Sequence, residues 1–241
     1  GFETQILPKP GLPQQVSVTL LTEAAARKAA MTPTLTMPLG QTLVLVDPSL
    51  ETQNPFTMGA SRRDPGRRAN EVEHPVELRR AFYIASTETT NAQFRQFEAT
   101  HDSGLIESYS LDRDHQPVAG ISWQQAASFC NWLSALEGLP PFYRENQGII
   151  IGFNPSSTGY RLPTEAEWAF SARVDGESLR RFAWGNDFPP TQVVTNVADN
   201  TSALVTGRIL NGYTDQFVVS APVGSFPPNH RGLHDMGGNV A

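Results

Sequence analysis

Glycine and proline interrupt this sequence about once in every six residues, which limits the length of any helix or strand. The 241 residues include 19 glycines and 19 prolines, whereas the two together make up roughly 12% of an average protein. Glycine favours turns, and proline cannot continue a helix or a central strand. The composition therefore predicts many turns and short regular elements around one substantial core.

Three helix starts are marked by a capping box, a serine or threonine followed three residues later by glutamine or glutamate. These pairs are Thr90 with Gln93, Ser122 with Gln125, and Thr164 with Glu167. The second box predicts the longest helix, which Gly138 ends. The third predicts a short helix that buries Trp168 and Ala172.

Short apolar runs outside these predicted helices predict strands rather than further helices. The candidate strands are 43–46, 56–59, 75–78 and 81–84, with a β-branched run at 149–151. After Trp184 the sequence predicts mostly loops. Strands and helices therefore occur together, and we expect an α+β fold rich in loops.

Charge and composition exclude several classes of function. The net charge of -6 and pI near 5.4 argue against a nucleic-acid-binding protein. No apolar run reaches the ~18 residues of a membrane span, so we expect none in this segment. The cluster Arg62-Arg63-Asp-Pro-Gly-Arg67-Arg68 is the one basic patch. It is either a site for an anionic ligand or a solvated loop, and nearby glutamates favour the loop.

Side chains that could carry chemistry have structural explanations as well. Cys130 is the single cysteine and lies on the apolar face of a predicted helix, which favours a buried residue over a reactive thiol. Glu165 and Glu167 fall in the first turn of a helix, where carboxylates favour capping over catalysis. His230 and His234 are four residues apart, but the glycine between them does not favour a helical metal site.

Seven segments, in this order along the chain, resemble the hallmark segments of the formylglycine-generating enzyme / sulfatase-modifying-factor family. They are Met58-Gly59, Glu88-Thr-Thr-Asn91, 117–133, 160–172, Trp184-Gly185, 221–229 and 232–241. The resemblance covers residues 41–241 and implies a C-type-lectin-like fold. In the family, a further C-terminal portion follows the equivalent of Asn239-Val-Ala241. The resemblance therefore implies that the fold is truncated here.

Calcium is the cofactor that this resemblance implies. Members of the family hold a structural Ca²⁺ through positions that match Asn196, Val197, Asp215 and Phe217. The resemblance also implies a second site at Asn239, completed by groups beyond Ala241. Amide, carboxylate and carbonyl oxygens from irregular loops are the ligands that Ca²⁺ takes.

The resemblance leaves the activity open between two functions. True enzymes of the family use O₂ and a copper ion held by two cysteines to oxidise a cysteine of a sulfatase to formylglycine. Those cysteines lie beyond the equivalent of Ala241, so copper is expected only if such a pair follows. The alternative is a non-catalytic C-type-lectin-like binding or accessory module of a bacterial envelope or secreted protein. The expected partner is a protein or peptide, or a glycan.

The N-terminal part of the sequence differs from the rest. Residues 1–21 alternate as a strand does and resemble the end of a PEGA domain, a small extracytoplasmic β module. The composition of residues 22–40 is typical of a linker, and we expect residues 41–241 to form the main domain. This organisation predicts an extracytoplasmic location in a bacterium.

Overall fold

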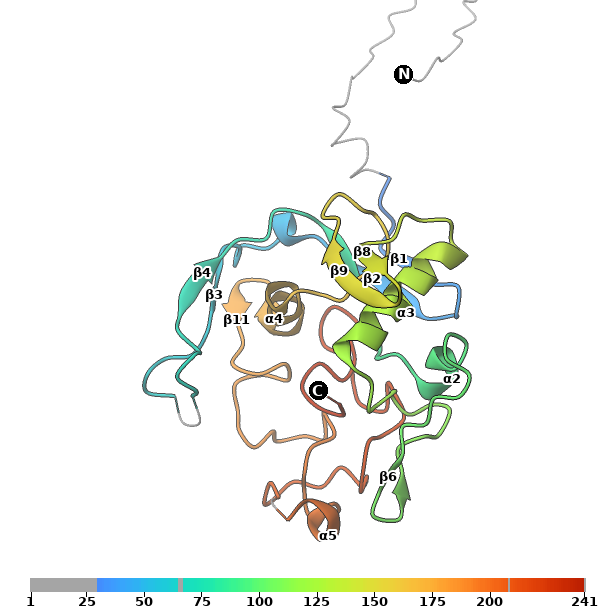
Figure 1. The fold of residues 1–241 in the computed structure, drawn as a ribbon. Coiled ribbons are helices and arrows are strands. Elements are labelled where there is room, and N and C mark those ends of the chain that lie inside the picture. The colour runs from blue at the N-terminus through green and yellow to red at the C-terminus, as the bar shows by residue number, and fades with distance from the viewer. Residues whose placement is uncertain (1–29, 65–66, 208, 241) are drawn as a thin grey trace, which may run out of the picture. The chain divides into compact units, whose positions relative to one another are not determined.

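The computed structural model describes residues 30–64, 67–207 and 209–240 of the chain. Its elements are short, and the longest described helix, α3, has 14 residues. Figure 1 shows them joined by long loops. In chain order they are β1 (Thr34–Thr36), β2 (Thr42–Val46), η1 (Pro48–Leu50), β3 (Phe56–Met58), β4 (His74–Val76), β5 (Phe82–Ala85), α2 (Asn91–Phe94), β6 (Leu105–Ile106), β7 (Tyr109–Ser110), α3 (Trp123–Leu136), β8 (Tyr143–Asn146), β9 (Ile149–Phe153), α4 (Glu165–Arg173), β10 (Val174–Asp175), β11 (Ser178–Leu179) and α5 (Ala203–Thr206). The expected loop-rich α+β fold is confirmed.

The central sheet has three antiparallel strands in the order β1-β2-β5. Leu43 of β2 pairs with Ala85 of β5, and Val46 pairs with Phe82. Strand β5 comes last in the strand order and forms one edge of the sheet. Val46 is fully buried, because alternate side chains of a strand point to the same face. The predicted strands at 43–46 and 81–84 match β2 and β5 within two residues.

The compact unit that contains this sheet begins at Pro33. Strand β1 pairs with β2 from Thr34 to Thr36, although the sequence indicated a linker as far as residue 40. A three-residue strand with exposed side chains carries no periodic signal that a sequence pattern could reveal. The PEGA-like segment, residues 1–21, lies outside the described residues.

All three predicted capping boxes form. The side chains of Thr90, Ser122 and Thr164 each accept a hydrogen bond from the backbone three residues on, and the partner side chain returns the contact. Helix α3 ends where Gly138 adopts φ +66, a left-handed conformation that costs glycine little. Local sequence therefore sets where the helices begin and where α3 stops.

One predicted burial on α4 is wrong. Ala172 is buried, but Trp168 is 42% exposed. Only nine residues form this helix, and its buried face is filled by Ala169, Phe170 and Ala172. The side chain of Trp168 instead borders the groove described below.

Within the described residues, three clusters of buried apolar side chains make the core. The first packs α4 against β2 and β3, with Phe170 stacked edge-on against Phe56 at 5.5 Å. The second and third both involve α3, which contributes the buried Phe129 to one and the buried Cys130 to the other. Helix α3 therefore links the sheet to the hairpin β8–β9.

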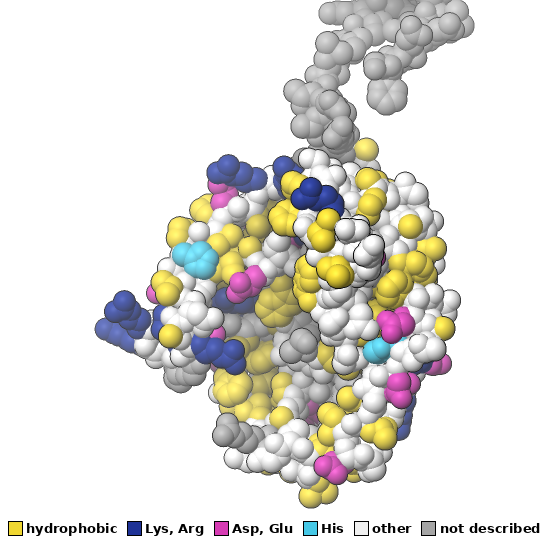
Figure 2. All heavy atoms as spheres, viewed as in Figure 1, with side chains coloured by type: hydrophobic (Ala, Val, Ile, Leu, Met, Phe, Trp, Pro, Cys, Tyr) yellow, Lys and Arg dark blue, Asp and Glu magenta, His cyan; other side chains and the backbone are white. Residues whose placement is uncertain are grey.

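Two surface regions stand out in Figure 2. Hydrophobic side chains gather over the hairpin β8–β9, where Ile149, Ile151 and Phe153 are each about 60% exposed. Dark-blue side chains gather near the hairpin β3–β4, whose loop carries the predicted arginine cluster. Within the described residues, no helix is both long and apolar enough to cross a membrane.

The chain from residue 186 to residue 240 is almost entirely loop, as predicted, and α5 is its one described helix. Buried polar groups hold these loops. The hydroxyl of Tyr213 accepts from the amides of Val194 and Thr195 and donates to the carbonyl oxygen of Thr195 at 2.6 Å. The arrangement of this region therefore depends on side-chain contacts rather than on a ladder of backbone bonds.

Candidate functional site

Two loops bring together the four residues expected to hold calcium. Asp215 is 3% exposed, and its carboxylate accepts from the backbone N–H of Val197 at 2.9 Å and of Phe217 at 2.8 Å. Burial raises the pKa of Asp215, and the nearby Asp199 adds to the rise. The segment Asn196–Val197 and the segment Asp215–Phe217 therefore lie side by side.

The donor set at this position fits Ca²⁺ in chemical type. It combines one carboxylate with an amide oxygen and two backbone carbonyls, all of them oxygen donors. Two carboxylates, Asp199 and Asp215, are buried here, and within the described residues neither forms an ion pair. Buried charge of one sign is unfavourable without a counter-charge. Among the described residues, no three His, Cys, Asp or Glu side chains gather as a metal site, so this candidate relies on amide and carbonyl groups.

The side chain of Asn239 has other partners. Its Oδ1 accepts from the amide of Ala221 at 2.7 Å, and its Nδ2 donates to Glu88 at 2.9 Å. The backbone amide of Asn239 donates to the carbonyl oxygen of Asn196 at 2.9 Å. Asn239 thus links three segments of the fold. The second calcium site stays a prediction.

A groove of about 1010 Å³ separates the central sheet from the helices and the C-terminal loop. One wall is the edge strand β5 with Leu35 of β1 and Leu43 of β2. The other walls come from α3, α4 and the segment 234–240, which contributes His234 to Gly238 and Val240. Most lining side chains are apolar, and the volume lies at the upper end of the range for small-molecule pockets.

Two carboxyl groups lie in the wall of this groove. Burial raises the pKa of Glu88 to about 8, although Asn239 donates to it, and Asp235 contributes a further rise. Burial also raises the pKa of Asp235. Within the described residues, Glu88 Oε1 and Asp235 Oδ1 are buried without a hydrogen-bond partner. These two oxygens are enclosed by the protein and lie beneath the surface of the groove wall.

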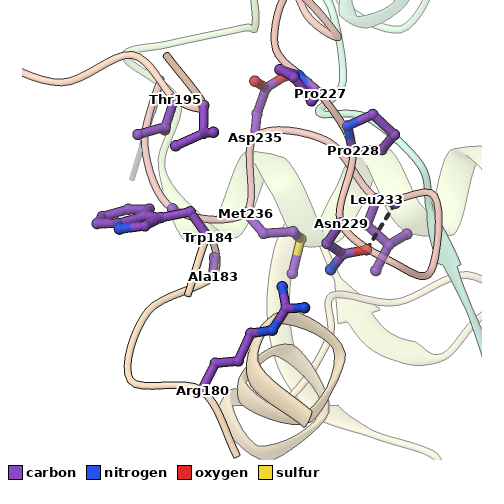
Figure 3. A pocket seen from close by; sticks show the side chains of 12 residues that line it. Arg180, Ala183, Trp184, Thr195, Pro227, Pro228, Asn229, Leu233, Asp235 and Met236 are labelled. Carbon is purple, nitrogen blue, oxygen red and sulfur yellow. Dashed lines mark hydrogen bonds between the residues drawn. The ribbon is translucent and has the colours of Figure 1, made fainter. Parts of the chain in front are cut away.

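A smaller pocket of about 100 Å³ lies behind the segment 233–237 (Figure 3). The side chains of Arg180, Asn229 and Met236 point toward one another there, and Trp184 lies across from them. The carboxylate of Asp235 points away from Arg180, so the guanidinium does not neutralise it. This space suits a few water molecules better than a ligand.

Comparison with known proteins decides which family this fold represents. Residues 52–241 match the sulfatase-modifying factor enzyme 1-like domain. The chain belongs to the formylglycine-generating enzyme / sulfatase-modifying-factor family. The resemblance expected from the seven sequence segments is confirmed.

The chain shares only modest sequence identity with individual members of the family. The chain is 28% identical over 177 residues to "Chaperone protein LppX" of Paenibacillus barcinonensis, a match that covers 66% of this chain and 60% of that protein. It is 32% identical over 182 residues to the formylglycine-generating enzyme of Mus musculus, covering 66% and 47% respectively. The chain therefore spans about half the length of these curated relatives.

Among solved structures, "Treponema denticola variable protein 1" shares the fold. The TM-score is 0.63 at 23% identity, over 86% of this chain and 74% of that one. This likeness confirms the C-type-lectin-like, loop-rich architecture of the formylglycine-generating enzyme family and says nothing further about activity.

The single cysteine does not provide the chemistry of the formylglycine-generating enzymes. Cys130 lies on α3 and is 8% exposed. Burial raises the pKa of its thiol to about 12, and Arg161 lowers it only slightly by comparison. The thiolate is the form that binds metals and reacts. Cys130 is therefore a buried core residue, as the sequence favoured.

The other candidates from the sequence have structural roles. The carboxylate of Glu167 accepts two hydrogen bonds from Arg161, at 2.7 and 2.5 Å. Its Oε2 also accepts from the backbone N–H of Thr164, the N-cap residue of α4, at 2.9 Å. In the arginine loop, Arg67 donates to the carbonyls of Ala60 and Glu71. These contacts support capping for Glu167 and a self-contained loop for the arginines.

The two histidines make separate contacts. Nδ1 of His230 lies 3.5 Å from Asp175, whereas Nδ1 of His234 lies 2.8 Å from the carbonyl oxygen of Phe226. His234 borders the groove and His230 does not. The two rings therefore contact different parts of the fold.

Sequence reasoning missed three buried carboxyl groups, Glu88, Asp199 and Asp235. Glu88 and Asp235 lie in family segments that the sequence did single out, but no local pattern shows that their side chains are buried. Asp199 lies in a loop without periodicity. Only the packing of segments far apart in the sequence places these groups in the interior.

Proposed function

We propose that this chain is a calcium-stabilised, polypeptide-binding domain that performs no thiol oxidation by itself. The observation that carries this proposal is the groove, since β5, an edge strand of the described sheet, lies along an apolar wall. An extended peptide can add to such an edge by backbone hydrogen bonds while its side chains fill apolar pockets.

The names of two relatives support a polypeptide as ligand. One is called a chaperone protein and the other a formylglycine-generating enzyme. A chaperone handles other polypeptides, and formylglycine-generating enzymes act on protein substrates. We place the domain outside the cytoplasm, in line with the extracytoplasmic location expected from its N-terminal segment and with a structural calcium ion.

Binding is tested with a fluorescently labelled peptide that covers the cysteine segment of a sulfatase, beside peptides of alternating apolar sequence. Leu35 is 44% exposed in the groove wall, whereas Leu50 is 77% exposed outside it. We expect Leu35→Lys to weaken binding at least about tenfold, equivalent to ~1.4 kcal/mol, and Leu50→Lys to leave it unchanged. Equal affinities of the two variants, or no binding by the unmodified chain, would refute the groove as the binding surface.

A longer form of the protein gives an informative comparison. If a gene-encoded chain longer than these 241 residues fails to bind peptides that the 241 residues bind, the groove is occupied within the longer chain. The binding function would then be rejected for the intact protein. Equal binding by both forms supports it.

Oxidation of a substrate cysteine is the second candidate, and the name of the mouse relative favours it. Copper would supply the redox chemistry, and a pair of soft thiolates suits Cu(I). The 241 residues contain one cysteine, and it is buried, so any such pair must lie outside them. A formylglycine assay on a sulfatase peptide is expected to show no turnover by these 241 residues.

Sequencing the gene beyond the codon for Ala241, with an intact mass of the protein, separates the two candidates. Two cysteines there would make the copper-dependent oxidase the leading hypothesis, and copper titration would follow. Their absence would remove that chemistry and leave the binding domain.

Calcium is tested by thermal unfolding. A ligand that binds only the folded state stabilises it by about 2.7 kcal/mol at one hundred times its Kd. We therefore expect a higher melting temperature in calcium than in EDTA, and Asp215→Asn should abolish the difference. Identical melting temperatures in the two buffers would rule out the site at Asn196, Val197, Asp215 and Phe217.

A further inference from the structure

Asp199 is a fully buried carboxylate beside the proposed calcium ligands, with 0% of its surface exposed. Its Oδ1 accepts from the backbone N–H of Thr201 at 2.7 Å and of Ser202 at 3.3 Å. Its Oδ2 accepts from the backbone N–H of Asp215 at 2.5 Å. Asp199 thus accepts from three backbone amides, one more than Asp215 does, and we assign it to holding the loops rather than to binding the ion.

These contacts connect the two loops that carry the proposed ligands. Asp199 holds the amide of Asp215, and Asp215 in turn holds the amide of Val197 at 2.9 Å. The side chain of one loop therefore fixes the backbone of the other in both directions. Ser202 keeps Asp199 in place, because its hydroxyl accepts from the amide of Asp199 at 2.9 Å and donates to the carbonyl oxygen at 3.1 Å.

The electrostatics point to the same role. Asp199 and Asp215 are both buried, and Oδ2 of Asp199 accepts from the amide of Asp215, so the two negative charges lie close together and repel each other in the absence of a cation. A divalent ion at Asp215 would turn this repulsion into attraction, since the charge around a calcium site helps to set its affinity.

We propose that Asp199 is a positioning residue of the calcium site, which orients Asp215 and adds a second negative charge without itself binding the ion. This inference rests on the proposed calcium site. It makes calcium affinity depend on a side chain outside the set of expected ligands.

The test compares Asp199→Asn with Ser202→Ala by calcium titration and by melting in calcium and in EDTA. Asp199→Asn is expected to weaken calcium binding about tenfold or more and to narrow the gap between the two melting temperatures. Ser202→Ala removes support from the same loop but no charge. It is expected to lower both melting temperatures together and to keep the gap.

The results separate the inference from the proposal on which it rests. If the unmodified chain shows no gap, both are overturned. If Asp215→Asn loses the gap but Asp199→Asn keeps it and lowers both melting temperatures equally, only the role of Asp199 is overturned.

Amide hydrogen exchange of the unmodified chain serves as a second measurement if Asp199→Asn does not fold. Calcium should slow exchange at Val197, Asp215 and Thr201 by about tenfold, because Asp199 couples the three amides. Slowing at Val197 alone would contradict the coupling.

Discussion

The segment from residue 90 to residue 173 and the segment from residue 186 to residue 240 use different means to hold one fold. The first contains α2, α3 and α4, each with a capping box, packed on aromatic and aliphatic clusters. The second contains one described helix of four residues, and its buried groups include Thr195, Asp199, Asp215 and Asp235.

This difference shows two ways of satisfying a buried backbone. Helices pair their own amides and carbonyls within a few residues, so only the ends need side chains. Loops must find partners elsewhere, and here carboxylates, amides and hydroxyls provide them. We therefore expect single polar substitutions to matter more in the loop segment than in the helical one.

The largest effect expected from a single substitution at constant pH is the removal of one hydroxyl from the loop segment. Tyr213→Phe leaves the amides of Val194 and Thr195 and one carbonyl without a partner, in a side chain that is 4% exposed. We expect a loss of about 3 kcal/mol in the free energy of unfolding, measured by urea denaturation. Tyr160→Phe, whose hydroxyl donates only to Glu137 at an exposed position, should lose less than about 1 kcal/mol. Similar losses in the two variants would contradict the comparison.

The second expected effect concerns pH. The pKa of Glu88 is raised to about 8 in the folded chain from a usual 4.5, so the folded state retains a proton that the unfolded state releases. Its stabilisation is complete below about pH 4.5 and declines as the pH rises toward 8, by at most about 1.4 kcal/mol per pH unit.

Melting curves in EDTA between pH 5 and pH 8 measure this decline, and EDTA keeps cations away from Glu88 and Asp235. Glu88→Gln, which stays neutral, should show a flatter profile over the same range. A decline as steep in Glu88→Gln as in the unmodified chain would assign it to other groups.

A smaller effect is expected at the helix caps. Ser122→Ala removes the side chain that accepts from the amide of Gln125 at 3.2 Å and should cost about 1 kcal/mol. Ser122→Asp retains an acceptor and should stay within about 0.5 kcal/mol of the unmodified chain. If Ser122→Ala lost more free energy of unfolding than Tyr213→Phe, the helical segment rather than the loop segment would be the more sensitive to single polar substitutions.

The smallest effect is expected at Leu204 of α5, which is 92% exposed. Leu204→Ser should change the free energy of unfolding by less than about 0.5 kcal/mol. This variant shows whether only substitutions of buried polar groups destabilise the loop segment, or whether substitutions anywhere in the segment do. A large loss at Leu204 would favour the second explanation.

The same difference explains what the sequence could predict. The capping boxes at Thr90, Ser122 and Thr164 are local signals, and all three were found from the sequence. The exposure of Trp168 was missed, because periodicity alone does not show where a groove begins.

The site could be predicted only as far as the family resemblance carried it. Asn196, Val197, Asp215 and Phe217 come from that resemblance, and the structure brings their segments together. Glu88 and Asp235 could not be found as a pair, because 147 positions separate them in the numbering of the chain. Their burial results from packing that no short window of sequence contains.

The hydrogen bond between Glu88 and Asn239 joins residues 151 positions apart, and that between Gln116 and Ser220 joins residues 104 apart. Closing a loop of this length lowers stability little, since each doubling adds only about 0.6 kcal/mol. The time needed to form such contacts is affected far more, because folding slows steeply as contacts become more distant in sequence. An architecture built on these bonds therefore limits how quickly the chain folds much more than how stably it remains folded.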